Sequence, residues 1–207
     1  MATPGFIDEE GVVHHEFNGG DHGLKMDFGV VKKGMPEYDT WVELNRDAIR
    51  SRYPDSNELI VVGVANGTTD FAFDVADAVG HHAVGLKSEK LPDKQVRLTQ
   101  AAKLYLENYM RKEPAVTVVL DDVGTTGRLA GLLALECLSV GAVSSDVQYT
   151  WQRSRVLWFL KNLEKDKKNN IRHVALINEV VPSLSPKDCL SKGDCSKGVE
   201  LIPHGED

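Results

Sequence analysis

The pattern of apolar and polar positions alternates between short strand-like runs and longer helix-like segments. Residues 59–62 and 116–120 form continuous rather than alternating apolar runs, which is typical of central strands buried on both faces of a parallel sheet. The pattern predicts five strands, at residues 58–64, 82–87, 116–121, 146–150 and 172–177. It predicts helices at residues 39–53, 70–79, 95–111, 127–140 and 152–164. This order indicates an α/β fold with a central, mainly parallel five-stranded sheet flanked by helices.

The chain has 207 residues, which is enough for one sizeable α/β domain. We therefore expect a single domain over residues 1–207. Residues 11–38 mix glycine, histidine and aromatic side chains, and residues 182–207 are rich in Pro, Ser, Lys and Gly. We expect both segments to be peripheral, as a hood and a tail beside the site.

The charge and the cysteines narrow the class of protein. A formal net charge of −7 predicts a surface that repels nucleic acid and anionic membranes. The sequence has neither a signal-peptide pattern at its start nor a stretch apolar enough for a transmembrane helix, so we expect a cytoplasmic protein. Three cysteines, Cys137, Cys189 and Cys195, are an odd number and favour reduced thiols over a disulfide framework.

The segment that follows the third predicted strand carries the strongest chemical signal. Ligands of open parallel sheets bind beyond the carboxyl ends of the strands, and here a buried strand ends in Asp121 and Asp122. Two such carboxylates can accept hydrogen bonds from a vicinal diol and stabilise positive charge on a sugar carbon. Thr125, Thr126 and Gly127 then open a helix whose N–H groups can hold a phosphate monoester. The alternative is a solvated turn with a helix cap.

A second turn, after the first predicted strand, could also bind an anion. Ala65, Asn66, Gly67 and Thr68 lead into a helix and can direct N–H groups at a phosphate, although such a sequence also occurs in ordinary tight turns. Neither turn has the nucleoside-triphosphate pattern or the dinucleotide Gly-x-Gly-x-x-Gly pattern.

Three cations lie beyond the ends of two further predicted strands. Lys87 and Lys90 follow the second predicted strand, where they could neutralise pyrophosphate or simply be solvated. Arg153 follows the fourth, where it could pair with a carboxylate or cap the next helix.

Residues 117–129, Thr-Val-Val-Leu-Asp-Asp-Val-Gly-Thr-Thr-Gly-Arg-Leu, resemble the phosphoribosyl pyrophosphate signature of type I phosphoribosyltransferases. Gly124 replaces a usual aliphatic residue of that signature, and Leu129 a small hydroxyl or basic one. The resemblance to the orotate enzymes extends over residues 15–28, the lysine segment and the cysteine-containing tail at 189–198. In the lysine segment, Leu86 and Pro92 stand where those enzymes carry an arginine and a histidine on a mobile loop.

The resemblance implies a role for each matching residue. Asp121 and Asp122 would contact the ribose, and the turn would take the 5′-phosphate through Val123, Gly124, Thr125, Thr126 and Gly127. The turn at 65–68 would bind the pyrophosphate and its metal, together with Lys87 and Lys90 as catalytic cations. The base would meet Lys25, Phe28 and Arg153.

The implied activity is transfer of a phosphoribosyl group from phosphoribosyl pyrophosphate to a nitrogenous base, with orotate favoured. The implied cofactor is Mg²⁺, bound mainly through the substrate rather than by a protein metal site. The implied partners are these two small molecules and a second copy of the chain in a homodimer. Two alternatives stay open: an enzyme for another purine or pyrimidine base, and a sensor that binds phosphoribosyl pyrophosphate or a nucleotide without turnover.

Overall fold

The computed structural model describes twelve stretches of the chain. They are residues 12–16, 22–26, 33–54, 59–65, 68–80, 83–92, 95–124, 126–152, 157–166, 168–178, 184–198 and 201–202. In the first two stretches and the last, the description covers the backbone only.

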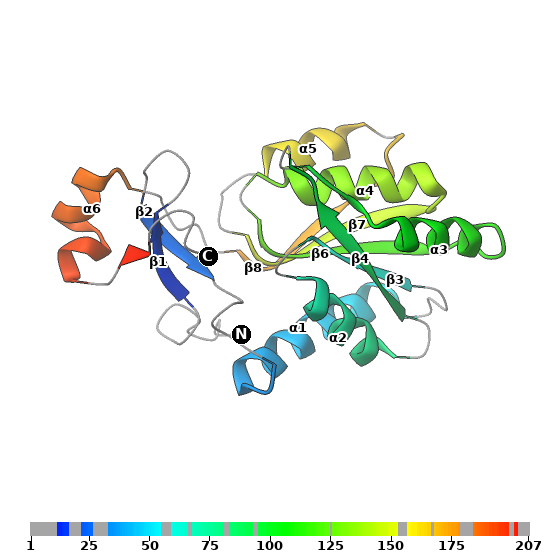
Figure 1. Ribbon diagram of the computed structural model, residues 1–207, viewed down its shortest axis with the longest axis horizontal. Coiled ribbons are helices and arrows are strands. Elements are labelled where there is room, and N and C mark those ends of the chain that lie inside the picture. The colour runs from blue at the N-terminus through cyan, green and yellow to red at the C-terminus, as the bar shows by residue number, and fades with distance from the viewer. Residues whose placement is uncertain are drawn as a thin grey trace.

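A six-stranded sheet forms the centre of the molecule (Figure 1), with the strand order β5-β4-β3-β6-β7-β8. The strands are β3 (Leu59–Gly63), β4 (Ala83–Lys90), β5 (Val96–Leu98), β6 (Val116–Gly124), β7 (Ser144–Gln152) and β8 (His173–Asn178). Neighbouring strands are parallel except β5, which pairs with β4 in the antiparallel sense. The predicted α/β architecture is therefore confirmed, with six strands rather than five.

Helices cover both faces of this sheet. They are α1 (Pro36–Arg52), α2 (Thr69–Val79), α3 (Gln100–Met110), α4 (Arg128–Val140) and α5 (Trp158–Lys165). A further helix, α6 (Pro186–Lys192), and a short 3-10 helix, η1 (Asp194–Lys197), lie apart from this sheet (Figure 1). Figure 1 shows α1 and α2 on one face and α3, α4 and α5 on the other. The central strands β3 and β6 contribute buried side chains to both layers, as their continuous apolar sequences predict.

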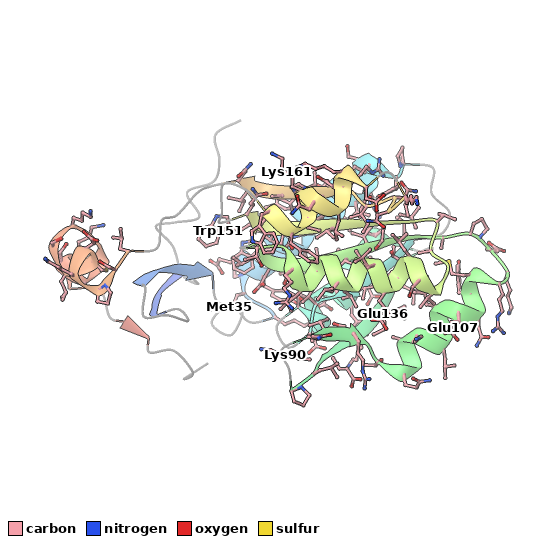
Figure 2. The ribbon with its side chains drawn as sticks, turned by 90° about the horizontal axis from the view of Figure 1, so that it is seen from above. Met35, Lys90, Glu107, Glu136, Trp151 and Lys161 are labelled. Atoms are coloured by element: carbon pink, nitrogen blue, oxygen red, sulfur yellow. The ribbon has the colours of Figure 1, made fainter. Side chains whose placement is uncertain are left out.

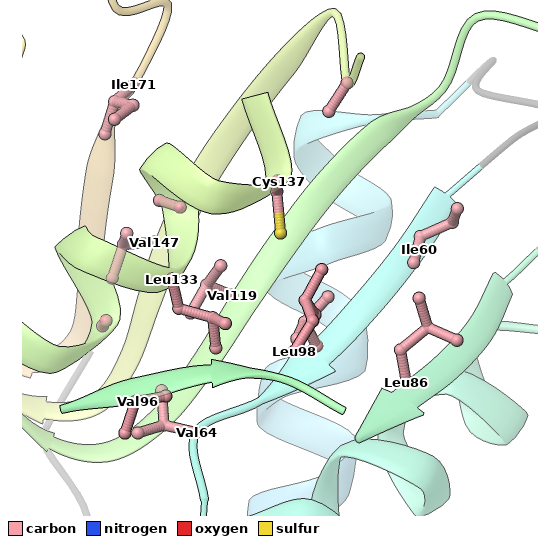
Figure 3. Packing of buried hydrophobic residues seen from close by; sticks show 14 of the residues in the cluster. Ile60, Val64, Leu86, Val96, Leu98, Val119, Leu133, Cys137, Val147 and Ile171 are labelled. Carbon is pink, nitrogen blue, oxygen red and sulfur yellow. The ribbon is translucent and has the colours of Figure 1, made fainter. Parts of the chain in front are cut away.

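Each face of the sheet has its own apolar core. On the face that carries α4, Val119 and Ile60 from the sheet pack with Leu133 and Cys137 from the helix (Figure 3). On the opposite face, Trp41 and Ile49 of α1 and Phe71 of α2 are among the side chains that pack on the sheet. The two layers hold the carboxyl ends of β3, β4 and β6 in register.

The strand β5 lies where the sequence pattern predicts the start of a helix. The predicted helix at 95–111 begins only at Gln100, because the Thr99 side chain accepts a hydrogen bond from the Ala102 N–H (3.2 Å) and caps it. Before it, the Leu98 N–H donates to a carboxylate oxygen of Glu136 on α4 (2.7 Å). A contact between residues distant in the sequence thus holds this segment extended.

Two other predicted helices have different bounds. The helix predicted at 39–53 begins at Pro36, and Tyr38 is already buried against the sheet. Residues 36–38 therefore belong to the main body rather than to the predicted peripheral segment at 11–38. The helix predicted at 152–164 begins at Trp158, since Gln152 is the last residue of β7.

A second, small sheet joins residues from the two ends of the described chain. It has the order β2-β1-β9, formed by β1 (Val12–Glu16), β2 (His22–Met26) and β9 (Leu201–Ile202). β1 is antiparallel to β2 and parallel to β9. Figure 1 shows this sheet beside the large one, and the backbones of β2 and β6 approach within 8 Å between Cα atoms. Within the described stretches, no helix has the length and apolar character needed to cross a membrane.

Candidate active site

The site begins where three neighbouring strands end at one edge of the large sheet. Leu120 of β6 lies opposite Gly63 of β3, and Gly63 lies opposite Lys87 of β4. The Val64 N–H donates to the Leu120 carbonyl (3.0 Å), which joins the exit of β3 to β6. Asp121 is the next residue on β6. The predicted acid pair, the turn after β3 and Lys87 therefore meet at this edge.

The two carboxylates continue β6 rather than leave it. β6 extends to Gly124, and Asp121 lies opposite Tyr149 of β7. The Asp122 N–H donates to Oδ1 of Asp121 (3.2 Å), and the Val123 N–H donates to Oδ1 of Asp122 (2.7 Å). Burial, followed by the neighbouring charge of Asp122, raises the pKa of Asp121 well above its ordinary value. The ionised form of Asp121 is therefore disfavoured, and a ligand that brings hydroxyl donors or positive charge would stabilise it.

The turn from β6 into α4 brings a hydroxyl to the start of the helix, where Thr126 Oγ1 accepts a hydrogen bond from the Arg128 N–H (3.3 Å). Gly127 has a φ of 73°, and a Cβ there would lie 2.8 Å from Cγ of Leu160, so this position requires glycine. The Phe159 N–H donates to the Thr126 carbonyl (3.3 Å) and holds the turn against α5. The first turn of α4 has no acidic residue, and Gly127 makes no side-chain cap. These features suit an anion at the helix N-terminus.

The turn after β3 is held by a buried hydroxyl. Thr68 is 1% exposed, and its Oγ1 donates to the carbonyls of Val64 (2.5 Å) and Leu120 (3.4 Å). A Cβ on Gly63 would lie 2.6 Å from the Thr68 carbonyl oxygen, so glycine allows α2 to start against the sheet. The Thr68 side chain thus fixes the turn, while Ala65 is partly exposed within it.

The two predicted lysines lie on one strand but not on one face. β4 extends through Lys90, and side chains three residues apart on a strand point to opposite faces. Lys87 is exposed, and its Nζ lies 5.7 Å from the centroid of the Phe73 ring of α2. Lys90 pairs with Val96 in the β4–β5 hairpin, and Figure 2 shows it at the edge of the main body. Paired strands therefore include Lys87 and Lys90, for which the resemblance implies a mobile loop.

The predicted contacts to the base fall largely outside the described residues. Lys25 lies on β2, whose backbone approaches β6. Phe28 and Arg153 lie outside the described stretches, as do Asn66, Gly67 and Thr125. The structure describes the strand that leads to Arg153, in which Trp151 is buried (Figure 2).

Tyr149 belongs to the site although the sequence analysis does not select it. A Cβ on Gly124 would lie 3.0 to 3.1 Å from three atoms of the Tyr149 ring, so the ring fills the space beside this glycine. The Tyr149 hydroxyl is buried and has no hydrogen-bond partner within the described part of the chain. Burial, followed by the charges of Asp121 and Asp122, raises the pKa of Tyr149. The one sequence feature that could have pointed to Tyr149 is Gly124, which stands where the phosphoribosyl pyrophosphate signature usually has an aliphatic residue.

Comparisons with known proteins agree with this architecture. No protein-family model matches the chain, and no curated protein matches its sequence. The fold is similar to that of an orotate phosphoribosyltransferase from Aeropyrum pernix, with a TM-score of 0.55, 18% identity, and 88% of this chain and 92% of that chain covered. It is also similar to an adenine phosphoribosyltransferase, with a TM-score of 0.55, 13% identity and coverages of 81% and 95%.

A third similar structure is the adenine phosphoribosyltransferase from Saccharomyces cerevisiae, with a TM-score of 0.50, 15% identity and coverages of 74% and 86%. The chain has the type I phosphoribosyltransferase fold.

Proposed function

We propose that this protein transfers a phosphoribosyl group from phosphoribosyl pyrophosphate to a nitrogenous base and releases pyrophosphate. The observation that carries the proposal is the single strand–turn–helix unit from Asp121 to Arg128. It places the buried carboxyl group of Asp121, whose pKa is raised, next to Asp122 and ahead of a helix whose first turn has no acidic residue. A sugar phosphate offers the complementary groups, namely a diol for the acids and a phosphate for the helix. The similar folds of the orotate and adenine enzymes support the same reaction.

In the proposed reaction, the bond between the anomeric carbon and the pyrophosphate oxygen breaks, and a bond from that carbon to a nitrogen of the base forms as the base releases a proton to solvent. Positive charge grows on the sugar ring as the pyrophosphate leaves. Asp121 and Asp122 stabilise that charge and bind the ribose hydroxyls, while Thr126 and Gly127 hold the 5′-phosphate at the start of α4. Lys87, exposed beside the turn after β3, neutralises the leaving pyrophosphate.

Magnesium fits this site as an ion that arrives with the substrate. Within the described stretches, no group of three or more His, Cys, Asp or Glu side chains could hold a metal. Mg²⁺ commonly keeps waters and takes phosphate oxygens as ligands, so it does not require such a group. When bound to the pyrophosphate, it would neutralise the negative charge of the leaving group.

One observation favours a second function, which is binding of phosphoribosyl pyrophosphate without turnover. Lys87 and Lys90 project to opposite faces of β4, and the β4–β5 hairpin is built of paired strands. Lysines on opposite faces of a strand give less neutralisation of a departing pyrophosphate than two lysines that act together. Such a protein would bind the ligand at the same strand–turn–helix unit.

The experiment is a measurement of pyrophosphate release from phosphoribosyl pyrophosphate and Mg²⁺, with one base at a time. The bases are orotate, uracil, adenine, guanine, hypoxanthine and xanthine. We expect release with orotate, and release with another base would reassign the substrate but keep the reaction. If no base gives pyrophosphate release but phosphoribosyl pyrophosphate binds, the result would favour the sensor. Neither release nor binding would contradict both functions.

A further inference from the structure

Burial of the Tyr149 hydroxyl costs free energy, and the packing of the Tyr149 ring does not explain why that cost is present. The residue is 1% exposed, and its hydroxyl has no hydrogen-bond partner within the described part of the chain. A buried polar group without a partner destabilises the fold, and phenylalanine would fill nearly the same volume without that cost. A hydroxyl in this situation is commonly explained by a state of the protein in which it has a partner.

The geometry points to the acid pair as that partner. Tyr149 lies directly opposite Asp121 in the register of β7 and β6. Its ring is confined beside Gly124, the last residue of β6, with three ring atoms close to the Cβ that the glycine lacks. The charges of both Asp121 and Asp122 act on the phenol, so its hydroxyl lies within their electrostatic reach.

We propose that Tyr149 is a positioning residue, whose hydroxyl donates a hydrogen bond to the Asp121 carboxylate when that carboxylate is ionised in the liganded site. This role rests on the proposed function, because the ionised form is the one that binds ribose hydroxyls and stabilises positive charge. A tyrosine hydroxyl bonds far more strongly to a carboxylate than to a neutral carboxyl group. Burial and the Asp122 charge raise the pKa of Asp121, so a hydrogen bond to its ionised form would lower this pKa again.

Other charged groups near this end of the sheet must be considered in any test that uses pH. Asp122 is the charged group that raises the pKa of Asp121. The neighbouring elements add two exposed cations, Arg128 at the first residue of α4 and Lys87 on β4. β2, whose backbone approaches β6, carries His22 and Lys25. Of these groups, the histidine has the ordinary pKa closest to neutral pH, so His22→Gln serves as a background control.

The test is the substitution Tyr149→Phe, which removes one oxygen and keeps the ring beside Gly124. Affinity for phosphoribosyl pyrophosphate is measured by calorimetry at about pH 6 and about pH 9. We expect affinity to fall about tenfold at the lower pH and much less at the higher pH, where Asp121 is ionised without help. The melting temperature of the unliganded protein should stay equal or rise. An equal loss of affinity at both pH values, or no loss at either, would overturn the proposal.

The matched control is Tyr53→Phe. The Tyr53 hydroxyl donates to a carboxylate oxygen of Asp146, in the other half of β7. Its removal should lower the melting temperature and leave the ratio of affinities at the two pH values unchanged. A purely structural role of Tyr149 would likewise leave the ratio of affinities at the two pH values unchanged.

A second measurement separates this proposal from the proposed function. Carbon-13 NMR follows the ionisation of the Asp121 carboxyl group in unliganded protein, so it needs neither substrate nor turnover. In Tyr149→Phe, the midpoint should move to higher pH, because the ionised form has lost its donor. If wild-type protein fails to bind phosphoribosyl pyrophosphate, the proposed function fails while this titration still decides the hydrogen bond. If wild-type protein binds phosphoribosyl pyrophosphate and the Asp121 midpoint does not move in Tyr149→Phe, the proposed role of Tyr149 is wrong.

Discussion

Two buried polar side chains of β7, Asp146 and Tyr149, differ in whether they have hydrogen-bond partners. In the amino-terminal half, Asp146 is 1% exposed and accepts hydrogen bonds from Tyr53 and from the Arg172 guanidinium (3.1 and 3.2 Å), with Arg52 3.6 Å away. In the carboxyl-terminal half, Tyr149 is equally buried and its hydroxyl has no partner within the described residues.

The difference distinguishes a structural polar cluster from the candidate site. Asp146 is surrounded by cations and donors, so its charge is already stabilised and needs no ligand. Asp121, opposite Tyr149, has a second carboxylate as its neighbour, and its charge is poorly stabilised. Burial alone therefore does not distinguish the candidate site from the structural cluster. A buried charge without neighbouring cations or donors to stabilise it does.

The largest effect is expected from removing the charge of the site. The double substitution Asp121→Asn and Asp122→Asn should lower turnover by about a thousandfold or more, since charge stabilisation and ribose binding both weaken. The fold should persist, because asparagine has nearly the same size as aspartate and keeps a side-chain oxygen that can accept the hydrogen bonds from the Asp122 and Val123 N–H groups. Initial rates of pyrophosphate release and thermal melting measure the two effects. Asp39→Asn, an exposed acid on α1, is the control, and near-normal turnover of the double variant would discard the site.

A large loss of stability, without loss of binding, is expected in the other half of β7. Asp146→Ala leaves Arg52 and Arg172 without their carboxylate partner and should lower the free energy of unfolding by about 3 kcal/mol. Denaturant unfolding measures the loss, with Asp166→Ala at an exposed position as the control. Affinity for phosphoribosyl pyrophosphate should not change. If Asp146→Ala keeps its stability but loses affinity, the Asp146 cluster would belong to the binding site rather than to the structural part of β7.

A smaller effect is expected in the dependence of stability on pH. The pKa of Asp121 is raised by folding, so the folded protein binds this proton more tightly than the unfolded chain. Stability therefore falls as pH rises from the ordinary pKa of aspartate toward the raised one. Asp121→Asn removes this contribution, so the variant should gain stability over wild-type protein increasingly as pH rises. Unfolding at several pH values measures the gain, and a gain that shrinks with rising pH would contradict the assignment.

The main strands and most helices could be predicted because their signals are local. The apolar runs that became β3 and β6 are buried on both faces, and Asp121 follows one of them at the expected edge. By contrast, β5 could not be predicted, since Val96–Leu98 is held extended by Glu136 from a helix that comes later in the sequence. Local periodicity contains no information about such a contact.

The sequence alone also could not predict how the two lysines are arranged or why Tyr149 matters. Lys87 and Lys90 look equivalent in a loop, and only the continuation of β4 through both residues assigns them to different faces. Tyr149 sits in a strand whose residues are all buried, so nothing in its own segment distinguishes it from a core residue. Its significance depends on Gly124, which lies on the neighbouring strand.

The pairing of β1 with β9 has a consequence for synthesis of the chain. β1 precedes every strand of the large sheet in the sequence, whereas β9 follows all of them. During translation, the β1–β2 hairpin and the large sheet can form before the ribosome has made Leu201 and Ile202. Until then, one edge of β1 lacks its native neighbour, and unpaired strand edges promote association with other chains. The small sheet is thus the last part of the described chain to be completed, and the period before its completion is when a nascent chain is most exposed to misassembly.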